Sequence, residues 1–324
     1  MTVFPRIAAF CACAVSICAL AACSEPAPGD TLPRVELEEG WAQIPEDATW
    51  GEVSAVDIDS HGHIFVLQRG ARAWQEPFPT DPIVEPVVYM FGADGALLAR
   101  WGAGETVMPH GLSVDPQDRV WITDVQREQV LQFSHDGALE MALGERGVAG
   151  DGPAHFGRPA DVAFDNTGVM VADGYTNRRI AIFDGEGQYV REWEGFDLPH
   201  SVVARGGRIY VANREGRRID ILSSEGDVLA SIATPGHPYA IKPLGDGRFL
   251  SLEGRDAADN SVAIFRLWRA DGTLERAFDA SGAGGIKGHD FALGEDGRVY
   301  VADIEGGRLL TFSLPATTLE QERD

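Results

Sequence analysis

One sequence pattern returns six times along the chain: an apolar segment, a polar turn, and then an alternating strand that ends in a polar residue. These second strands are predicted at residues 63–68, 119–124, 169–173, 208–213, 248–253 and 298–303. Their last residues lie 56, 49, 40, 40 and 50 positions apart. A period of this length suits four strands per unit and is too long for leucine-rich or ankyrin repeats.

Two more strand-like runs follow most of these strands, for example residues 129–134 with 138–142, and 179–183 with 188–193. Turns rich in Asp and Gly join them at 135–137 and 184–187. Four antiparallel strands, repeated six times, predict an all-β protein with the fold of a six-bladed β-propeller, in which ring closure protects the sheet edges. The 38 glycines and 18 prolines show no collagen-like period and fit short strands joined by tight turns.

The last repeat lacks a fourth strand. Its third strand is predicted at residues 308–314, after which the chain becomes polar. The strand-like run at 34–38, ahead of the first full repeat, can fill the missing place and close the ring. Closure makes residues 33–315 one domain, followed by a polar tail at 316–324. The alternative fold, two stacked β-sandwiches, would need a linker between them, and we find none.

The N-terminal residues are predicted to be an export signal. Arg6 precedes an apolar run at 7–19 that is too short for a permanent membrane span. Residues 20–23 resemble a bacterial lipobox, which predicts a lipoprotein signal at 1–22, a lipid on Cys23 and a tether at 23–32. An ordinary cleaved signal with an incidental cysteine is the alternative. All four cysteines lie in the first 23 residues, so the repeats fold without internal disulfides.

The charge balance limits the partners. The chain has 50 acidic and 27 basic residues, a formal net charge of -23. Removing residues 1–22 takes away Arg6 and no acidic residue, which leaves 26 basic residues and a net charge of -24. This field repels phosphate backbones, so nucleic acid is not expected as a partner. We expect a monomer in a bacterial envelope, at the outer membrane or on the periplasmic side, that meets the membrane only through its lipid; Ser24 favours the outer membrane.

Histidine occupies one register position in every second repeat. Aligning the first strands on their apolar residue makes six residues equivalent: Ser54, His110, Ala160, His200, Tyr239 and His289. Alternate blades of a six-fold ring are about 120° apart and innermost strands line the channel, so three imidazoles can converge on its axis. Three neutral histidines with an open fourth position suit a catalytic zinc. The other five fall in turns or loops and are predicted to be solvated: His61, His63, His135, His155 and His237.

Residues just after the second strands are expected on the same face as these histidines. They are Arg69, Tyr175, Arg214 and Arg255. Arginines and a tyrosine around a metal suit a carboxylate-bearing substrate and an acid or base beside a Lewis acid. A surface ion pair is the competing interpretation of each arginine, and it is the one we favour for Arg255.

Short motifs at these residues follow one another along nearly the whole mature chain. They are Gln68–Gly70 with Trp74, Pro109–Leu112, Val120–Asp124, Asp173–Tyr175 with Asn177 and Arg179–Ile180, Pro199–Ser201, Asn213–Glu215 and Gly288–Asp290. With these motifs in this order, the chain resembles the peptidyl-α-hydroxyglycine α-amidating lyases, zinc- and calcium-dependent six-bladed propellers with NHL-type repeats. Separately, several of the motifs would fit any NHL propeller.

The resemblance implies two metals and a reaction. It implies a zinc ion bound by His110, His200 and His289. It also implies a calcium ion bound by the Asp290 carboxylate and the backbone carbonyls of Val56 and Leu112. It implies cleavage of the C–N bond of a C-terminal α-hydroxyglycine, giving an amide and glyoxylate, from a small-molecule or peptide substrate with a C-terminal carboxylate. Tyr175 matches the catalytic tyrosine and takes a proton, Arg69 matches the catalytic arginine that favours the phenolate, and Arg214 holds the carboxylate.

The chain departs from the animal members of this family near the predicted site. Lys287 and Gly288 precede His289 where those members carry an apolar residue and proline, Gln68 replaces a histidine, and residues 71–73 are less polar. Thr176 stands in place of a disulfide cysteine. Two other functions stay open: a non-catalytic, lipid-anchored NHL-propeller binding module, and a lactonase-like hydrolase, which usually places calcium on channel carboxylates.

Overall fold

A computed structural model describes residues 32–314 of the chain, except 245, 255–262 and 282–284. The predicted signal, Cys23, nearly all of the tether, the C-terminal tail and Arg255 lie outside the described residues. Within the described residues every regular element is a β-strand. The search for a membrane-spanning helix, made over these same residues, finds none long and apolar enough.

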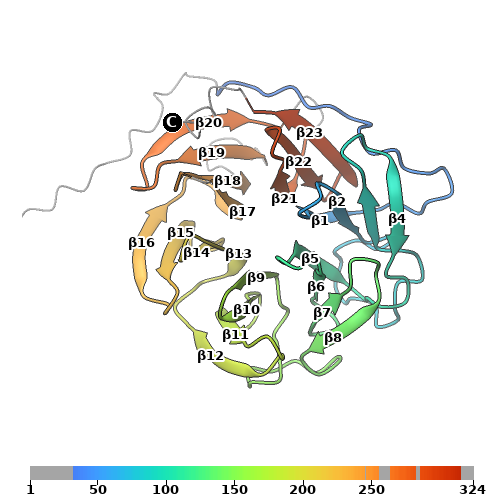
Figure 1. Ribbon diagram of the computed structural model, residues 1–324, viewed down its shortest axis with the longest axis horizontal. Coiled ribbons are helices and arrows are strands. Elements are labelled where there is room, and N and C mark those ends of the chain that lie inside the picture. Colours follow the sequence, from blue (N-terminus) through green and yellow to red (C-terminus); the bar gives the residue numbers. More distant parts are fainter. Residues whose placement is uncertain (1–31, 245, 255–262, 282–284, 315–324) are drawn as a thin grey trace, which may run out of the picture. The chain divides into compact units, whose positions relative to one another are not determined.

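The described strands form six antiparallel sheets arranged as blades around a central axis (Figure 1). Blades 1 and 2 contain β1 (Val53–Ile58), β2 (Ile64–Gln68), β3 (Val88–Phe91), β4 (Leu97–Trp101), β5 (Pro109–Val114), β6 (Val120–Asp124), β7 (Gln129–Phe133) and β8 (Leu139–Leu143). Blades 3 and 4 contain β9 (Asp161–Asp165), β10 (Gly168–Asp173), β11 (Arg179–Phe183), β12 (Tyr189–Trp193), β13 (Pro199–Arg205), β14 (Arg208–Asn213), β15 (Arg218–Ser223) and β16 (Val228–Ala233). Blades 5 and 6 contain β17 (His237–Pro243), β18 (Phe249–Gly254), β19 (Ile264–Trp268), β20 (Leu274–Asp279), β21 (Gly288–Leu293), β22 (Arg298–Asp303) and β23 (Arg308–Ser313).

The predicted propeller is therefore confirmed, and the six predicted second strands agree with the structure to within one residue at each end. The first strand of each blade lies nearest the axis, and the fourth strand of the first five blades lies outermost, as Figure 1 shows. One hydrophobic cluster fills the space between each pair of neighbouring blades. Because both faces of the inner strands are buried, β2, β6 and β11 carry no exposed residue.

The sixth sheet has three strands among the described residues, and the N-terminal segment lies along its open edge. Glu38 and Thr311 of β23 exchange two backbone hydrogen bonds, of 2.7 and 3.1 Å. The start of the segment pairs instead with blade 5, where Val35 N donates to Asp279 O over 3.1 Å. The predicted closing segment is in the expected place, but it makes isolated bridges to two blades and no continuous strand. Val35 and Leu37 alternate with acidic residues and pack into the core between these blades.

A polar residue at the end of each second strand holds the segment that leads into the first strand. The Asp124 carboxylate accepts hydrogen bonds from Val107 N at 2.6 Å and Met108 N at 3.0 Å. The corresponding side chains of the other blades accept from a backbone N–H in the same way: Gln68, Asp173, Asn213, Glu253 and Asp303. This repeated contact explains why each repeat ends in a polar residue, and it fixes where each inner strand begins.

Candidate active site

The three histidines predicted to converge do meet on the axis. His110, His200 and His289 come from β5, β13 and β21, and all three are buried. Their ring centroids lie 5.0, 4.7 and 4.9 Å apart, and one ligand atom from each lies within 4.8 Å of the others. Alternate blades thus bring side chains about 90 residues apart to one point.

Each imidazole is oriented by the next blade. Nδ1 of His110 lies 2.8 Å from Ala160 O, Nδ1 of His200 lies 2.8 Å from Tyr239 O, and Nδ1 of His289 lies 2.6 Å from Ser54 O. These acceptors occupy the same register position as the histidines. Because a carbonyl can only accept, Nδ1 carries the proton in all three rings, and Nε2 keeps a free lone pair.

Burial keeps these rings neutral. It lowers the pKa of His110 and His200 well below the usual value, and that of His289 to about 3. Among the described residues, the buried Nε2 of His200 has no hydrogen-bond partner. An unpaired buried nitrogen is costly, and a metal ion would satisfy it. Three neutral imidazoles with fixed tautomers therefore fit a tetrahedral zinc with one open position.

Gly111, directly after His110, permits this orientation. A Cβ at this position would lie 2.4 Å from Ala160 O, the oxygen that accepts the His110 Nδ1 proton. We expect Gly111→Ala to push that carbonyl away, to lower the free energy of unfolding by about 1–3 kcal/mol and to weaken zinc affinity by about 10–100-fold. Thermal unfolding and zinc titration measure these effects.

Gly185→Ala is the matched control, because nothing lies within 4 Å of a Cβ there and its backbone is outside the left-handed region. Equal zinc affinity in the two variants would show that the Ala160 carbonyl does not orient His110.

Tyr175 is placed against the histidines by the turn after β10. Its hydroxyl oxygen lies 2.9 Å from His110 Nε2 and accepts a hydrogen bond of 3.3 Å from Arg214 Nη1. The preceding Gly174 lets the turn approach the next blade, where a Cβ would lie 2.2 Å from Pro199 O. Burial raises the pKa of Tyr175, while Arg214 and Arg69 act in the opposite direction. The resting side chain is therefore a neutral phenol beside two cations.

Arg69 is fully buried, and its side-chain hydrogen bonds go to Glu52 and Pro109, not to Tyr175. Nη1 pairs with Glu52 Oε2 at 2.7 Å, and Nε donates to Pro109 O at 2.8 Å, next to His110. Its guanidinium carbon lies 5.1 Å from the centre of the Trp74 ring, which itself lies 5.4 Å from the Tyr175 ring. Against the effect of burial, both arginines lower the pKa of Tyr175 and so favour the phenolate, Arg214 through its charge and a hydrogen bond and Arg69 through its charge.

The sequence analysis assigned no role to two residues of the site, Tyr239 and Glu52. Tyr239 shares the register of the histidines, accepts from His200, and lies with its ring 5.2 Å from the Arg214 guanidinium carbon. Its register position was the available signal. Glu52 pairs with Arg69 and also accepts from Trp74 N at 3.1 Å. Nothing in its sequence context distinguishes it, because it precedes a strand like many other polar residues.

The departures from the animal sequences have structural roles here. Gln68 accepts from Gly51 N at 3.0 Å and donates to Pro86 O at 2.7 Å, so it holds the first blade together. The Lys287 ammonium pairs with Glu305. A Cβ on Gly288 would lie 3.1 Å from the Leu252 side chain.

Further along the channel, the inner strands carry partly buried carboxylates. Asp290 Oδ2 accepts from Val56 N at 3.1 Å, and Asp161 Oδ2 accepts from Val202 N at 3.0 Å. Burial raises the pKa of Asp161, and it raises that of Asp290 to about 7. The Lys242 ammonium lies 3.7 Å from Asp57 Oδ1 in the same channel. Burial disfavours its charge, but the surrounding carboxylates outweigh that effect and raise the pKa of Lys242.

Of the remaining histidines, which were predicted to be solvated, one is mostly exposed, and the side chains of the other four are 24–32% exposed: His63, His135, His155 and His237. The side chains of His63 and His135 are 30% and 31% exposed, and both contact the buried carboxylate of Asp59. His61 is 64% exposed, as a solvated residue should be.

Comparisons with known proteins give one consistent group of relatives. The chain is 29% identical over 297 residues to a probable peptidyl-alpha-hydroxyglycine alpha-amidating lyase of Caenorhabditis elegans, which covers 82% of this chain and 83% of that protein. It is 30% identical to peptidyl-alpha-hydroxyglycine alpha-amidating lyase 2 of Drosophila melanogaster, over 68% of this chain and 61% of that protein. It is 31% identical to NHL repeat-containing protein 3 of Mus musculus, over 72% and 70%. The chain spans about a third of the longer curated relatives, which are peptidyl-glycine alpha-amidating monooxygenases.

No family model matches the chain. Among solved structures, a streptogramin B lyase superimposes with a TM-score of 0.61 at 13% identity, covering 86% of this chain and 98% of that one. At this identity the likeness shows the shared propeller fold alone.

Proposed function

The chain belongs to the family of NHL-repeat propellers and is homologous to peptidyl-α-hydroxyglycine α-amidating lyases, and from this premise we propose that it is itself a zinc-dependent lyase. Its proposed substrate ends in an α-hydroxyglycine, whose C–N bond is cleaved to give an amide and glyoxylate. One observation carries the proposal: the free Nε2 lone pairs of three histidines converge, and the Tyr175 hydroxyl lies 2.9 Å from one of them.

The three histidines are the residues that would hold the zinc. When bound, Zn²⁺ would supply Lewis acidity toward an oxygen of the substrate. In its absence the Tyr175 hydroxyl can donate to His110 Nε2. Once that lone pair is engaged by a metal, the phenol is free to face a substrate in the open position.

The chain's own residues then divide the remaining work. Arg214, with a guanidinium that already contacts the Tyr175 hydroxyl, can bind the substrate carboxylate. Tyr175, a neutral phenol, passes its own proton to the departing nitrogen and in exchange takes the proton of the substrate hydroxyl, while the charges of Arg214 and Arg69 favour the phenolate that forms between these transfers. As the carbonyl of glyoxylate forms, the C–N bond breaks and the nitrogen leaves with one proton, so the reaction is a net transfer of the hydroxyl proton to nitrogen. Trp74 and Tyr239 form apolar walls beside these groups.

A structural calcium is the second metal of the proposal, held by the Asp290 carboxylate and the carbonyls of Val56 and Leu112. Two partly buried carboxylates with a raised pKa, Asp290 and Asp161, support a hard cation in the channel. Lys242 compensates one of the negative charges there and leaves the others for the metal.

Attachment by a lipid on Cys23, at the periplasmic side of a bacterial envelope, remains a prediction of the sequence. A monomer with no nucleic-acid partner remains one as well.

The function is tested by incubating the zinc- and calcium-loaded protein with α-hydroxyhippurate and measuring glyoxylate and benzamide. We expect the two products in equal amounts. Metal-loaded protein that releases neither product contradicts the proposal and supports a binding module. Opening of a lactone by protein loaded with calcium alone would support the hydrolase.

A further inference from the structure

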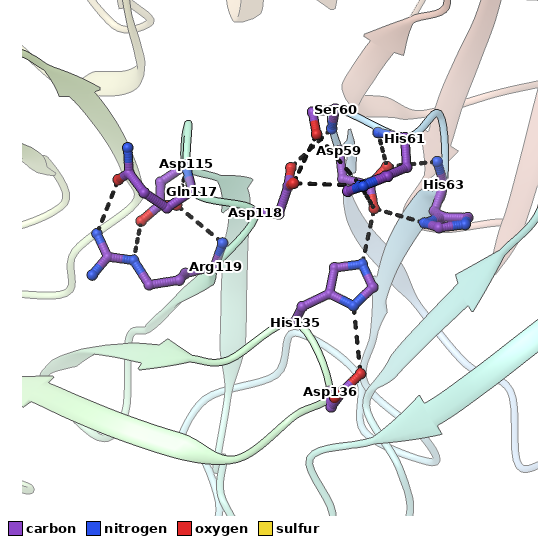
Figure 2. Close-up of polar contacts among 10 residues, drawn as sticks. All are labelled: Asp59, Ser60, His61, His63, Asp115, Gln117, Asp118, Arg119, His135 and Asp136. Carbon is purple, nitrogen blue, oxygen red and sulfur yellow. Dashed lines mark hydrogen bonds and ion pairs between the residues drawn. The ribbon is translucent and has the colours of Figure 1, made fainter.

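A second cluster of metal-ligating side chains lies at the opposite end of β1 from the three-histidine centre. The β1–β2 turn contributes Asp59, His61 and His63, and the β7–β8 turn of blade 2 contributes His135 (Figure 2). Asp59 comes five residues after Ser54, which lies at the level of the active-site histidines. At about 3.3 Å per strand residue the two clusters are roughly 16 Å apart along the strand.

The Asp59 carboxylate is buried and held rigidly. Its Oδ1 accepts from His61 N at 2.9 Å and from His63 N at 2.7 Å. Its Oδ2 faces three imidazoles, at 2.7 Å from His63 Nδ1, 2.9 Å from His135 Nε2 and 3.9 Å from His61 Nδ1. Figure 2 shows the His63 and His135 rings pointing at this oxygen from two different blades.

The equivalent turn of blade 2 shows what the repeat normally does with this carboxylate. Asp115 Oδ1 accepts from two turn amides, like Asp59 Oδ1. Asp115 Oδ2, however, is filled by Arg119 Nε at 2.7 Å and Trp121 Nε1 at 2.9 Å. In blade 1 the arginine is replaced by His63 and the tryptophan by Phe65. A guanidinium cannot bind a metal, whereas an imidazole that loses its proton can.

The spacing of these atoms suits a tetrahedral ion. Bonds of 2.0–2.1 Å place neighbouring ligand atoms of a tetrahedral zinc about 3.3–3.4 Å apart. The separations from Asp59 Oδ2, 2.7 Å to His63 Nδ1 and 2.9 Å to His135 Nε2, are slightly shorter than that spacing, so small side-chain shifts are enough. His135 Nδ1 lies 3.5 Å from Asp136 Oδ1, which places a carboxylate behind the ring as in many metal sites.

The surroundings favour a cation. Asp59 lies at the wall of a funnel of about 1080 Å³ on this face, which is also lined by Asp57, Asp115, Asp118 and Asp296. Asp118 Oδ2 lies 3.4 Å from His61 Nδ1. Carboxylates gathered in a concave surface raise the local concentration of divalent cations.

We propose that Asp59, His63 and His135 form a second transition-metal site that binds Zn²⁺ and joins the first two blades. The ion replaces the protons that these imidazoles now share with Asp59. Calcium is not the ion that this site binds, because imidazole nitrogen is a poor partner for a hard cation.

The test measures bound Zn²⁺ per chain after equilibrium dialysis with excess Ca²⁺, which occupies sites made only of oxygen. We expect two Zn²⁺ ions in the wild type and one in His63→Arg, because this change restores the Asp–Arg pair of blade 2 and the three-histidine centre stays intact. His135→Gln, a second variant in a partly exposed turn, should also bind one. His200→Gln lacks the active-site metal, and Zn²⁺ at a hundredfold excess over Kd should raise its midpoint of thermal unfolding by about 5 °C. Adding His63→Arg to this variant should abolish that rise.

His155→Gln is the control, because His155 is a part-exposed histidine of the β8–β9 connection, away from this cluster, whose Nε2 lies 3.4 Å from Glu145 of the same connection. It should retain two ions. Two ions in His63→Arg, or an equal loss in His155→Gln that shows scavenging by surface histidines, would overturn the proposal. The measurement counts metal ions, so its outcome does not depend on whether the protein proves to be a lyase.

Discussion

Tyr175→Phe should release glyoxylate from an α-hydroxyglycine about 10²–10⁴-fold more slowly than the wild type, with the loss in kcat. The structure places the Tyr175 hydroxyl between His110 Nε2 and Arg214 Nη1, where it can accept the proton of the substrate hydroxyl. Removing one oxygen leaves the ring against Trp74, so the fold and the metal centre should persist. Steady-state kinetics and zinc content together measure the effect.

Tyr189→Phe is the matched control for this change. Tyr189 lies on the outermost strand of its blade and its hydroxyl donates to Glu192 at 3.0 Å, far from the axis. Its kcat should equal that of the wild type. If kcat in Tyr175→Phe fell by less than about tenfold with zinc bound, another group would have to accept the proton.

His200→Gln should remove the zinc ion bound by the three histidines on the propeller axis and lower kcat/KM by a factor of about 10³ or more. The Nε2 lone pair of His200 is buried and unpaired among the described residues, so its replacement leaves two imidazoles for the ion. A metal ion contributes several kcal/mol to stabilising charge in a transition state, and each 1.36 kcal/mol is about tenfold in rate. Metal analysis should find one Zn²⁺ fewer per chain.

Added Zn²⁺ should not restore the activity of His200→Gln, because the two remaining imidazoles leave the ion one ligand short, although Ala160 and Ser54 still fix their tautomers. His155→Gln, with its histidine away from the axis, should behave as the wild type. Full activity in His200→Gln without bound zinc would exclude the three-histidine centre from the reaction.

Much of the candidate site follows from strand register. The equivalence of His110, His200 and His289 was visible in the sequence, because each first strand is short, buried and aligned by its apolar residues. The closing segment was also found, but the sequence could not show that it would bridge two blades. Its pairing depends on where the β20 and β23 edges lie in space.

Contacts between loops were not predictable in the same way. The resemblance indicated Arg69 as the cation that favours a Tyr175 phenolate, whereas the hydrogen bond to Tyr175 comes from Arg214. Both arginines follow a second strand at the same level, and sequence position alone does not say which guanidinium turns inward. Trp74, in the long β2–β3 connection, and Glu52 hold the Arg69 guanidinium where its charge acts on Tyr175 without a hydrogen bond.

By itself, the sequence determined the ring of six blades and the alternation of histidine around it, because strand period and turn chemistry are local properties that repeat along the chain. The tertiary structure alone decided which side chains from different blades share one atom. Asp59 and His135 are 76 residues apart and belong to turns of different blades, so only the packing of those blades brings them to a separation of 2.9 Å.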